Sequence, residues 1–230
     1  MKSRFHDALR LWLPPLLTIV CVRSAVASPF HVPTGSMVPT IEIGDRILVS
    51  KLAYGLQVPW IDVDAGLSLQ ALSTREVLTW AEPDRGDVLL FRSPPEPGVD
   101  YVKRVVGVPG DVVSVRSGVV RVNGEPIRGG LAGEHPFVDE DCHAWPGRAF
   151  EESIEGHRYE VLDSVLREGP DYGPVVVPEG SLFVLGDNRD HSRDSRYWGM
   201  LPRERVRGRV MAVWMSHGCD GETRMRWRSL

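Results

Sequence analysis

Residues 111–122, DVVSVRSGVVRV, alternate apolar and polar side chains on both sides of Ser117-Gly118. Alternation with a period of two is the pattern of a strand with one buried face, and a short turn containing Gly favours a β-hairpin. Asn123-Gly124 follows at once as a second strong turn signal. This segment therefore predicts local antiparallel pairing and constrains the chain toward a β fold.

Other short segments rich in Val, Ile and Leu also predict strands. Residues 67–80 are the best candidate for a helix outside the N-terminus, and residues 128–156 show so little periodicity that we expect an inserted loop region there. Strands do not alternate with helical segments, so the sequence predicts a mostly β fold and not a doubly wound sheet. The expected strands are residues 45–52, 87–92, 101–108, 157–162, 181–185 and 205–215.

Length and composition are those of an ordinary globular protein. The 230 residues suffice for one sizeable core, and a net charge of −4 argues against general nucleic-acid binding. The three cysteines form no CxxC pair and the seven histidines are scattered, so we expect no metal and no cofactor. Cys142 and Cys219 are able to pair in an oxidising compartment, although two cysteines alone leave this open.

The N-terminus begins with a short basic segment, residues 1–10, followed by an apolar run that Arg23 interrupts. The run alone is shorter than the roughly 30 Å of a bilayer core, so a transmembrane anchor requires residues 11–28 with Arg23 reaching toward the interface. Ala25-Val26-Ala27 fits equally well the cleavage site of a removable signal peptide. Either interpretation leaves the basic start in the cytoplasm and exports residues 29–230.

Ser36 lies in the segment PTGSMVPT, residues 33–40, with a Gly before it and Pro on both flanks. Such a turn holds a hydroxyl beside free backbone N–H groups, the arrangement that a nucleophile next to an oxyanion-binding site requires. The simpler alternative is a plain loop of Ser, Thr, Gly and Pro, which is common in proteins. Ser36 is therefore a candidate nucleophile that depends on its context.

Lys103 lies in the expected strand YVKRVVGVPGD, residues 101–111, next to Arg104. Adjacent strand residues face opposite sides, so one of these two side chains is expected to point inward. A lysine buried against apolar groups loses its proton more easily because desolvation disfavours its charged form. A neutral Lys103 is able to act as general base for a Ser, whereas a solvent-facing lysine is the more frequent case.

Residues 186–199, GDNRDHSRDSRYWG, place charges of both signs together with Ser and Asn in one short segment. A solvated loop with exposed ion pairs is the simple interpretation, and a hydrogen-bonded network that positions other residues is the functional one. His191, beside Asp190 and Asp194, also suggests a Ser-His-Asp triad with Ser36. We rank the triad below the Ser–Lys pair because an exposed histidine explains His191 more simply.

Four segments, in this order, resemble the signature sequences of bacterial type I signal peptidases. The resemblance extends from about residue 33 to residue 199, with a gap over the variable residues 125–175. It implies a signal-peptidase-like β catalytic domain with a variable inserted β/loop region, carried on an N-terminal membrane anchor helix. The four segments are GSMVPT (35–40), RGDVLLFRSP (85–94), YVKRVVGVPGD (101–111) and GDNRDHSRDSRYWG (186–199).

The resemblance also implies a role for each matched residue. Ser36 would be the nucleophile and Lys103 the general base, while the Ser36 amide and the Thr34 hydroxyl would bind the oxyanion. Ser192 matches the serine that hydrogen-bonds the lysine in this family. The positions that support the site from behind are Asp194 and Arg196.

The implied activity is that of a membrane-bound serine endopeptidase. It would remove N-terminal signal peptides after small residues at −1 and −3, through an acyl-enzyme. Its partners would be preprotein signal peptides and the lipid bilayer, with the catalytic domain on the extracytoplasmic side of the bacterial cytoplasmic (inner) membrane, on one membrane pass.

Three other functions remain open from the residues. One is a specialised processing peptidase of the same family, of the pilin or conjugation type. Another is a self-cleaving regulator with a similar dyad, against which the apolar N-terminus counts. The third is a non-enzymatic envelope-binding domain, which would leave the Ser and Lys segments unexplained. Ala25-Val26-Ala27 also offers a cleavage site within the chain, for the protein itself or a sister enzyme.

Overall fold

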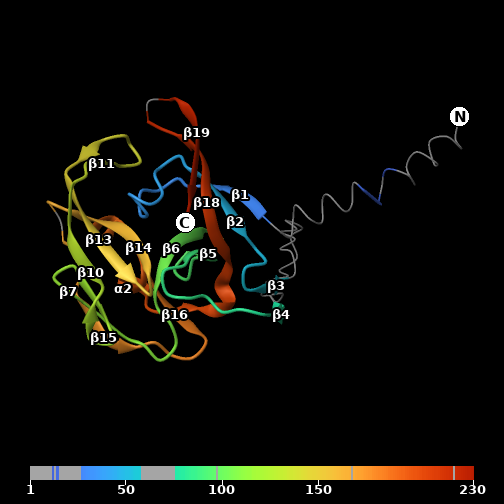
Figure 1. The fold of residues 1–230 in the computed structure, drawn as a ribbon, viewed down its shortest axis with the longest axis horizontal. Helices are drawn as coiled ribbons and strands as arrows, with labels where there is room; N and C mark the ends of the chain where they lie inside the picture. Colours follow the sequence, from blue (N-terminus) through green and yellow to red (C-terminus); the bar gives the residue numbers. More distant parts are fainter. Residues whose placement is uncertain are drawn as a thin grey trace, which may run out of the picture.

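The computed structural model describes residues 27–57, 76–96, 98–166, 168–219 and 221–230, together with Trp12, Pro14 and Pro15. It confirms a mostly β fold built from antiparallel sheets (Figure 1). Most of the predicted anchor lies outside these residues. Among the residues that the structure describes, we find no helix with the length and apolar character needed to cross a membrane.

The main sheet has the spatial order β1-β2-β18-β5-β6-β16-β17, and β19 pairs with β18. Its predicted strands are confirmed to within a few residues at each end. The bounds are β1 (Ala27–His31), β2 (Arg46–Ser50), β5 (Val88–Arg92), β6 (Asp100–Gly107), β16 (Ser181–Leu185), β17 (Leu201–Pro202), β18 (Val206–His217) and β19 (Thr223–Ser229).

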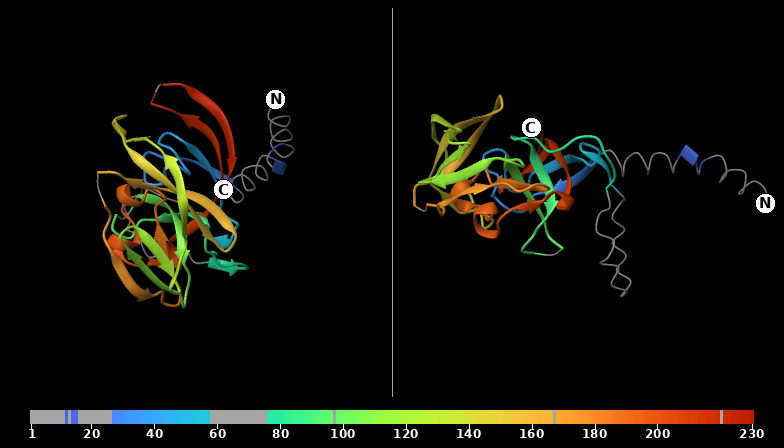
Figure 2. Two further views of the ribbon diagram at one scale, coloured as in Figure 1. Left: turned by 60° about the vertical axis from the view of Figure 1, so that its left-hand side comes forward. Right: turned by 90° about the horizontal axis from the view of Figure 1, so that it is seen from below.

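Two smaller sheets lie at the side of the molecule away from β1 and β2 (Figures 1 and 2). One has the order β15-β7-β8-β9 and the other β10-β13-β14. The predicted hairpin is confirmed, with positive φ angles of 47° and 71° at Ser117 and Gly118. The bounds are β7 (Val112–Arg116), β8 (Val119–Val122), β9 (Glu125–Pro126), β10 (Arg128–Glu134), β13 (Gly147–Ile154), β14 (His157–Ser164) and β15 (Tyr172–Val176).

The remaining described elements are short. They are β3 (Gly55–Gln57), β4 (Glu76–Thr79), β11 (Phe137–Val138), β12 (Ala144–Trp145), the 3-10 helices η1 (Arg189–His191) and η2 (Arg203–Arg205), and the helix α2 (Ser195–Trp198).

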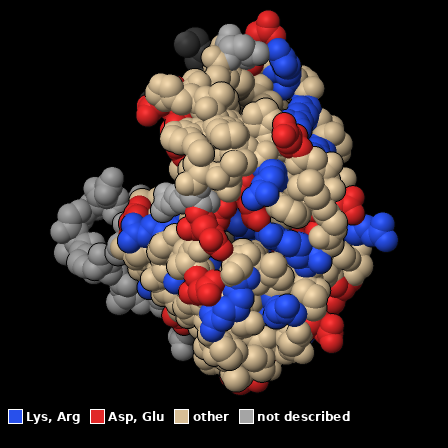
Figure 3. Space-filling model, turned by 90° about the vertical axis from the view of Figure 1, so that its left-hand side faces the viewer, with Lys and Arg blue, Asp and Glu red and all other residues tan. Residues whose placement is uncertain are grey.

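Figure 3 shows acidic and basic side chains interspersed over the face that carries the smaller sheets, with both signs side by side.

The expected loop over residues 128–156 is a wrong prediction, because much of this region forms β10 and β13. Strand β13 pairs with β14 along its whole length. Its inward positions include Ala149 and Ile154 but also Glu152, and this buried charge hides the apolar period in the sequence. Irregular register and several glycines conceal β10 in the same way.

The expected helix over residues 67–80 is wrong where it can be compared with the structure. Residues 67–75 lie outside the described ranges, and Glu76–Thr79 forms strand β4, paired with β3. Pairing with a second strand decides the conformation here, since a short segment has only a weak intrinsic preference.

The apolar core fixes the turn that carries Ser36. Alternate residues of β5 enter two different clusters, Leu90 on one face and Phe91 on the other. A strand buried on both faces appears in sequence as a continuous apolar run. The Leu90 cluster also contains Val32, which precedes Ser36, and Met37 and Ile41, which follow it, so the turn after β1 is held against the sheet on both sides of Ser36.

A disulfide joins Cys142 and Cys219, with their Cα atoms 5.8 Å apart. The sequence left this pairing open. Cys142 lies between β11 and β12, and Cys219 lies between β18 and β19. The bond therefore ties the inserted region to one end of the main sheet.

Candidate active site

The side chains of Ser36 and Lys103 meet in one hydrogen bond. Lys103 Nζ donates to Ser36 Oγ at 2.6 Å and to the Val102 carbonyl at 2.8 Å. Ser36 lies in the turn that follows β1, and Lys103 lies on β6. The fold therefore brings together the two residues that the sequence singled out in separate segments.

Lys103 is buried, with only 3% of its surface exposed. Burial lowers the pKa of Lys103 to about 8, and the negative charges of Asp194 and Asp187 oppose this effect without cancelling it. The unperturbed pKa of lysine is roughly 10.4. A useful fraction of Lys103 is therefore neutral near physiological pH and able to accept a proton.

Arg104 is buried as well, although the sequence led us to expect only one of the two adjacent cations to point inward. Its guanidinium donates to both oxygens of Asp187, at 2.9 and 2.7 Å. The Thr40 hydroxyl donates to the same carboxylate at 2.5 Å. Asp187 therefore links the Ser36 turn, strand β6 and the segment 186–199 behind the site.

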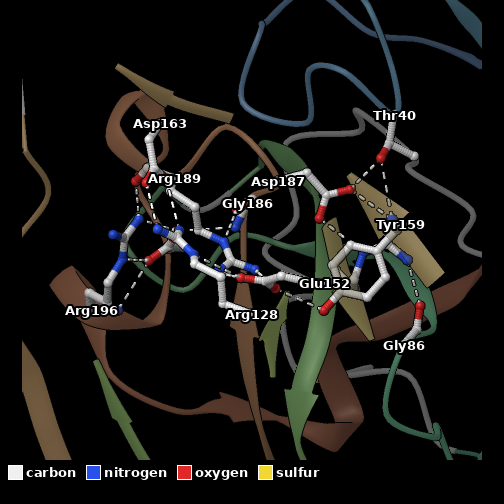
Figure 4. A network of polar contacts seen from close by, with 12 residues as sticks. Thr40, Gly86, Arg128, Glu152, Tyr159, Asp163, Gly186, Asp187, Arg189 and Arg196 are labelled. Carbon is white, nitrogen blue, oxygen red and sulfur yellow. Dashed lines mark hydrogen bonds and ion pairs between the residues drawn. The ribbon is translucent and has the colours of Figure 1, made fainter. Parts of the chain in front are cut away.

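Residues 186–199 form a largely buried network, not a solvated loop. Asp194 accepts hydrogen bonds from the Gly186 amide at 3.0 Å and from Arg196 Nε at 2.9 Å. Arg196 also donates to the Arg189 carbonyl, and Arg189 donates to Glu152 (Figure 4). The network interpretation of this segment is therefore the right one.

The inserted region supplies partners that sequence analysis missed (Figure 4). Glu152 on β13 accepts hydrogen bonds from Arg189 and from the Tyr159 hydroxyl. The Tyr159 ring lies 3.9 Å from the Arg104 guanidinium, and Arg128 pairs with Asp163 at 2.7 Å. The sequence carried no local signal for these partners, because the charge of Glu152 at an inward position also hides the apolar period of β13.

Asn188 holds the backbone around Ser36. Its N–H donates to the Ser36 carbonyl at 3.1 Å, and its side-chain amide donates to the Gly35 carbonyl at 3.1 Å. A side chain at Gly186 would place its Cβ 2.5 Å from the Ser36 carbonyl oxygen and 2.2 Å from Ser192 Oγ. The segment from Gly186 to Asn188 therefore packs directly beneath the Ser36 turn, in a way that only glycine at position 186 permits.

Ser192 and Thr34 both lie near the Ser36–Lys103 pair, but they differ in exposure. Ser192 is buried, and its Oγ has no hydrogen-bond partner within the described part of the chain. The hydrogen bond from Lys103 to Ser192 that the resemblance implied is not formed in this structure. Thr34 is exposed, and no described residue hydrogen-bonds to its hydroxyl or to the Ser36 N–H.

A cleft of about 280 Å³ contains the Ser36–Lys103 pair. Much of its lining is apolar, from residues of β1, β2, β5 and β6 and of the turn that carries Ser36. Its size and open shape suit a segment of extended peptide. The apolar lining residues are Phe30, Val32, Pro33, Met37, Ile47, Leu90, Val99, Tyr101 and Val102.

His191 also lines the cleft, packed against the rings of Phe137 and Trp145 at centroid distances of 4.9 and 6.0 Å. Ser36 Oγ receives its hydrogen bond from Lys103 and not from His191. The geometry therefore favours the Ser–Lys pair over the Ser-His-Asp triad.

Comparison with known proteins places this chain in a family. Residues 5–215 match the family model described as signal peptidase, peptidase S26. Signal peptidase I of Pseudomonas fluorescens is 38% identical over 218 residues, 89% of this chain and 70% of that protein. Signal peptidase I of Pseudomonas aeruginosa gives the same values over 216 residues, and that of Aquifex aeolicus is 30% identical over 231 residues, 87% of this chain and 80% of that protein. With its Ser36–Lys103 pair in an open cleft, the chain belongs to the signal peptidase family, peptidase S26.

Proposed function

We propose that the protein is a serine endopeptidase that removes N-terminal signal peptides from preproteins, cutting after small residues at −1 and −3. The observation that carries this proposal is the 2.6 Å hydrogen bond between buried Lys103 and Ser36 inside a peptide-sized cleft. Membership of the signal peptidase family supports the substrate class.

In the proposed mechanism, neutral Lys103 takes the proton from Ser36 Oγ as this oxygen attacks the carbonyl carbon of the −1 residue. The carbon–nitrogen bond then breaks, and the Lys103 ammonium gives its proton to the departing amine. Neutral Lys103 next takes a proton from a water molecule that attacks the acyl-enzyme. As the bond between the acyl carbon and Ser36 Oγ breaks, the Lys103 ammonium returns a proton to Oγ, and the second product is released as a carboxylic acid that loses its proton to solvent.

The Ser36 N–H and the Thr34 hydroxyl are the proposed oxyanion donors. Support comes from their position: both belong to the turn that carries Ser36, and no described residue uses either donor. One such donor is typically worth roughly 3–4 kcal/mol of transition-state stabilisation.

Ser192, Asp194 and Arg196 are proposed as positioning residues. The Lys103 ammonium has three N–H donors, and the structure gives acceptors for two of them. The buried Ser192 hydroxyl is a suitable acceptor for the third when the ammonium forms. Asp194, held by Arg196, contributes a negative charge that stabilises the same ammonium.

The experiment that tests the function is cleavage of a preprotein with an Ala-X-Ala site, with mass spectrometry of both products. We expect a single cut after the −1 Ala, none with Ser36→Ala, and retained cleavage with Ser153→Ala, an exposed serine on β13. Thr34→Val in the same assay tests the oxyanion donor. Failure to cut any of several preproteins would refute the proposal, and cleavage of one dedicated substrate alone would favour the specialised processing peptidase.

We further propose that the N-terminal apolar segment anchors the protein in the bacterial cytoplasmic membrane, with the catalytic domain on the extracytoplasmic side. The apolar run after a basic start supports this. The predicted bounds of 11–28 are two residues too long, because Ala27 and Ser28 already belong to β1 and pair with β2. Membranes washed at alkaline pH should retain the protein, and N-terminal sequencing should find residue 1 or 2. Ala27 is paired with Ser50 in β1, which protects the bond after Ala27. A mature chain that starts at Ser28 would instead show that the segment is removed.

A further inference from the structure

Glu140 lies in the inserted region but reaches the cleft that contains Ser36. We propose that Glu140 makes this peptidase select substrates by charge, favouring Lys or Arg and disfavouring Asp or Glu next to the scissile bond. This inference rests on the proposed endopeptidase function and adds a charge criterion to the criterion of side-chain size.

The Glu140 carboxylate contacts the turn that carries Ser36. Glu140 Oε1 accepts a hydrogen bond from the Gly35 N–H at 3.3 Å, one residue before Ser36. The Glu140 side chain lines the same cleft as Ser36 and Lys103. A substrate whose scissile carbonyl approaches Ser36 therefore passes within a few ångströms of this negative charge.

The charge of Glu140 is not balanced by a neighbour. No ion pair joins Glu140 to any residue in the described ranges. The other Asp, Lys and Arg side chains that line the cleft are paired or buried. They are Asp100, paired with Arg207 at 2.6 Å; Arg193, paired with Glu96 at 3.3 Å; and Lys103, which burial makes easy to deprotonate.

The turn that carries Glu140 is held in place by several contacts. The Asp139 carboxylate accepts hydrogen bonds from the amides of Asp141 and His143, at 3.0 and 2.8 Å, and from Trp145 Nε1 at 2.8 Å. The Cys142–Cys219 disulfide then ties the turn to the β18–β19 hairpin. These contacts also account for the proximity of Asp139, Asp141 and His143, so we propose no metal site there.

The size of the effect follows from Coulomb interaction across water. Two unit charges about 5 Å apart in water change a rate or binding constant by a factor of roughly 4. Exchanging an attracted Lys for a repelled Glu at one substrate position therefore changes kcat/KM by a factor of about 16, which is on the order of tenfold. Because Glu140 is exposed, salt should reduce this preference.

The test uses peptides with Ala at −1 and −3 and with Lys, Gln or Glu placed in turn at −2, +1 or +2. The readout is the ratio of kcat/KM for the Lys and Glu peptides at each position, at low and high salt. We expect a ratio of about ten at one or more positions for the wild type, falling close to one with Glu140→Gln. Glu134→Gln, an exposed glutamate of β10 outside the cleft, should keep the wild-type ratio.

A wild-type ratio near one at all three positions would overturn the inference. So would a ratio that Glu140→Gln leaves unchanged, or one that Glu134→Gln lowers equally. These results differ from failure of the proposed function, in which the wild type would cleave no peptide faster than Ser36→Ala does.

Discussion

Lys103→Met is expected to lower kcat/KM for preprotein cleavage by about 10³-fold or more without unfolding the protein, because it removes the base that contacts Ser36 Oγ. Lys103→Arg should be equally inactive, since a guanidinium keeps the positive charge but does not give up its proton in this pH range. Lys51→Ala is the matched control, because Lys51 does not line the cleft. If Lys103→Met stays active while His191→Ala is inactive, the base has been assigned wrongly.

The same lysine should set the pH dependence of the wild type. Its pKa of about 8 means that the neutral, reactive form increases with pH and becomes dominant above that value. We therefore expect kcat/KM to rise roughly tenfold per pH unit below 8 and to level off above it. A midpoint near 6.5, the ordinary value for histidine, would contradict this assignment.

Protein stability gives an independent check that Lys103→Met is folded. The pKa of folded Lys103, about 8, lies below the roughly 10.4 of an unfolded lysine, so the unfolded chain binds this proton more tightly. Burying the charged Lys103 amine therefore lowers the free energy of unfolding. This loss is fully present below about pH 8, decreases between pH 8 and roughly 10.4, and is absent above that value. Removing the amine should therefore raise the free energy of unfolding at pH 7, by up to about 3 kcal/mol. Urea unfolding of both proteins at pH 7 measures this, and a clear loss of stability would contradict it.

The sequence identified Ser36 and Lys103 because each lies in a segment whose residue types already restrict the backbone or the side-chain environment. Thr34, Asp194 and Arg196 were implied only by the resemblance of these segments to type I signal peptidases. The strands were predictable where the apolar pattern is local, as in β7 and β8, whose turn residues carry the signal.

The remaining features depend on contacts that no local pattern records. The burial of Arg104 requires Asp187, which comes from a strand end 83 residues away. Strand β13 was taken for a loop because Glu152 occupies an inward position that only Arg189 makes tolerable. Glu140 is an exposed glutamate in an irregular turn, so its place in the cleft depends on Asp139 and on the disulfide. In each of these cases, a contact between residues that are distant in the sequence determines where the side chain or strand lies.

Glu152→Ala is expected to destabilise the protein by about 3–5 kcal/mol, because it leaves the Arg189 guanidinium buried without its partner. Arg189 is 2% exposed, and its two terminal nitrogens donate to the two oxygens of Glu152. Urea unfolding at pH 7 measures the loss. Glu151→Ala is the matched control, since this neighbour on β13 is exposed and should change stability by less than about 0.5 kcal/mol.

A double variant that removes both charges distinguishes two quantities. One is the free-energy cost of leaving Arg189 buried without a partner, and the other is the net contribution of the Glu152–Arg189 ion pair to stability. Glu152→Leu combined with Arg189→Met should recover much of the stability lost in Glu152→Ala, because an apolar pair of similar volume leaves no unpaired charge. Activity should not recover in parallel, since the adjacent Asn188 holds the backbone at Ser36 and depends on the same network for its position. A loss below about 1 kcal/mol in Glu152→Ala would mean that water reaches Arg189 and that the network behind Ser36 is less buried than the structure indicates.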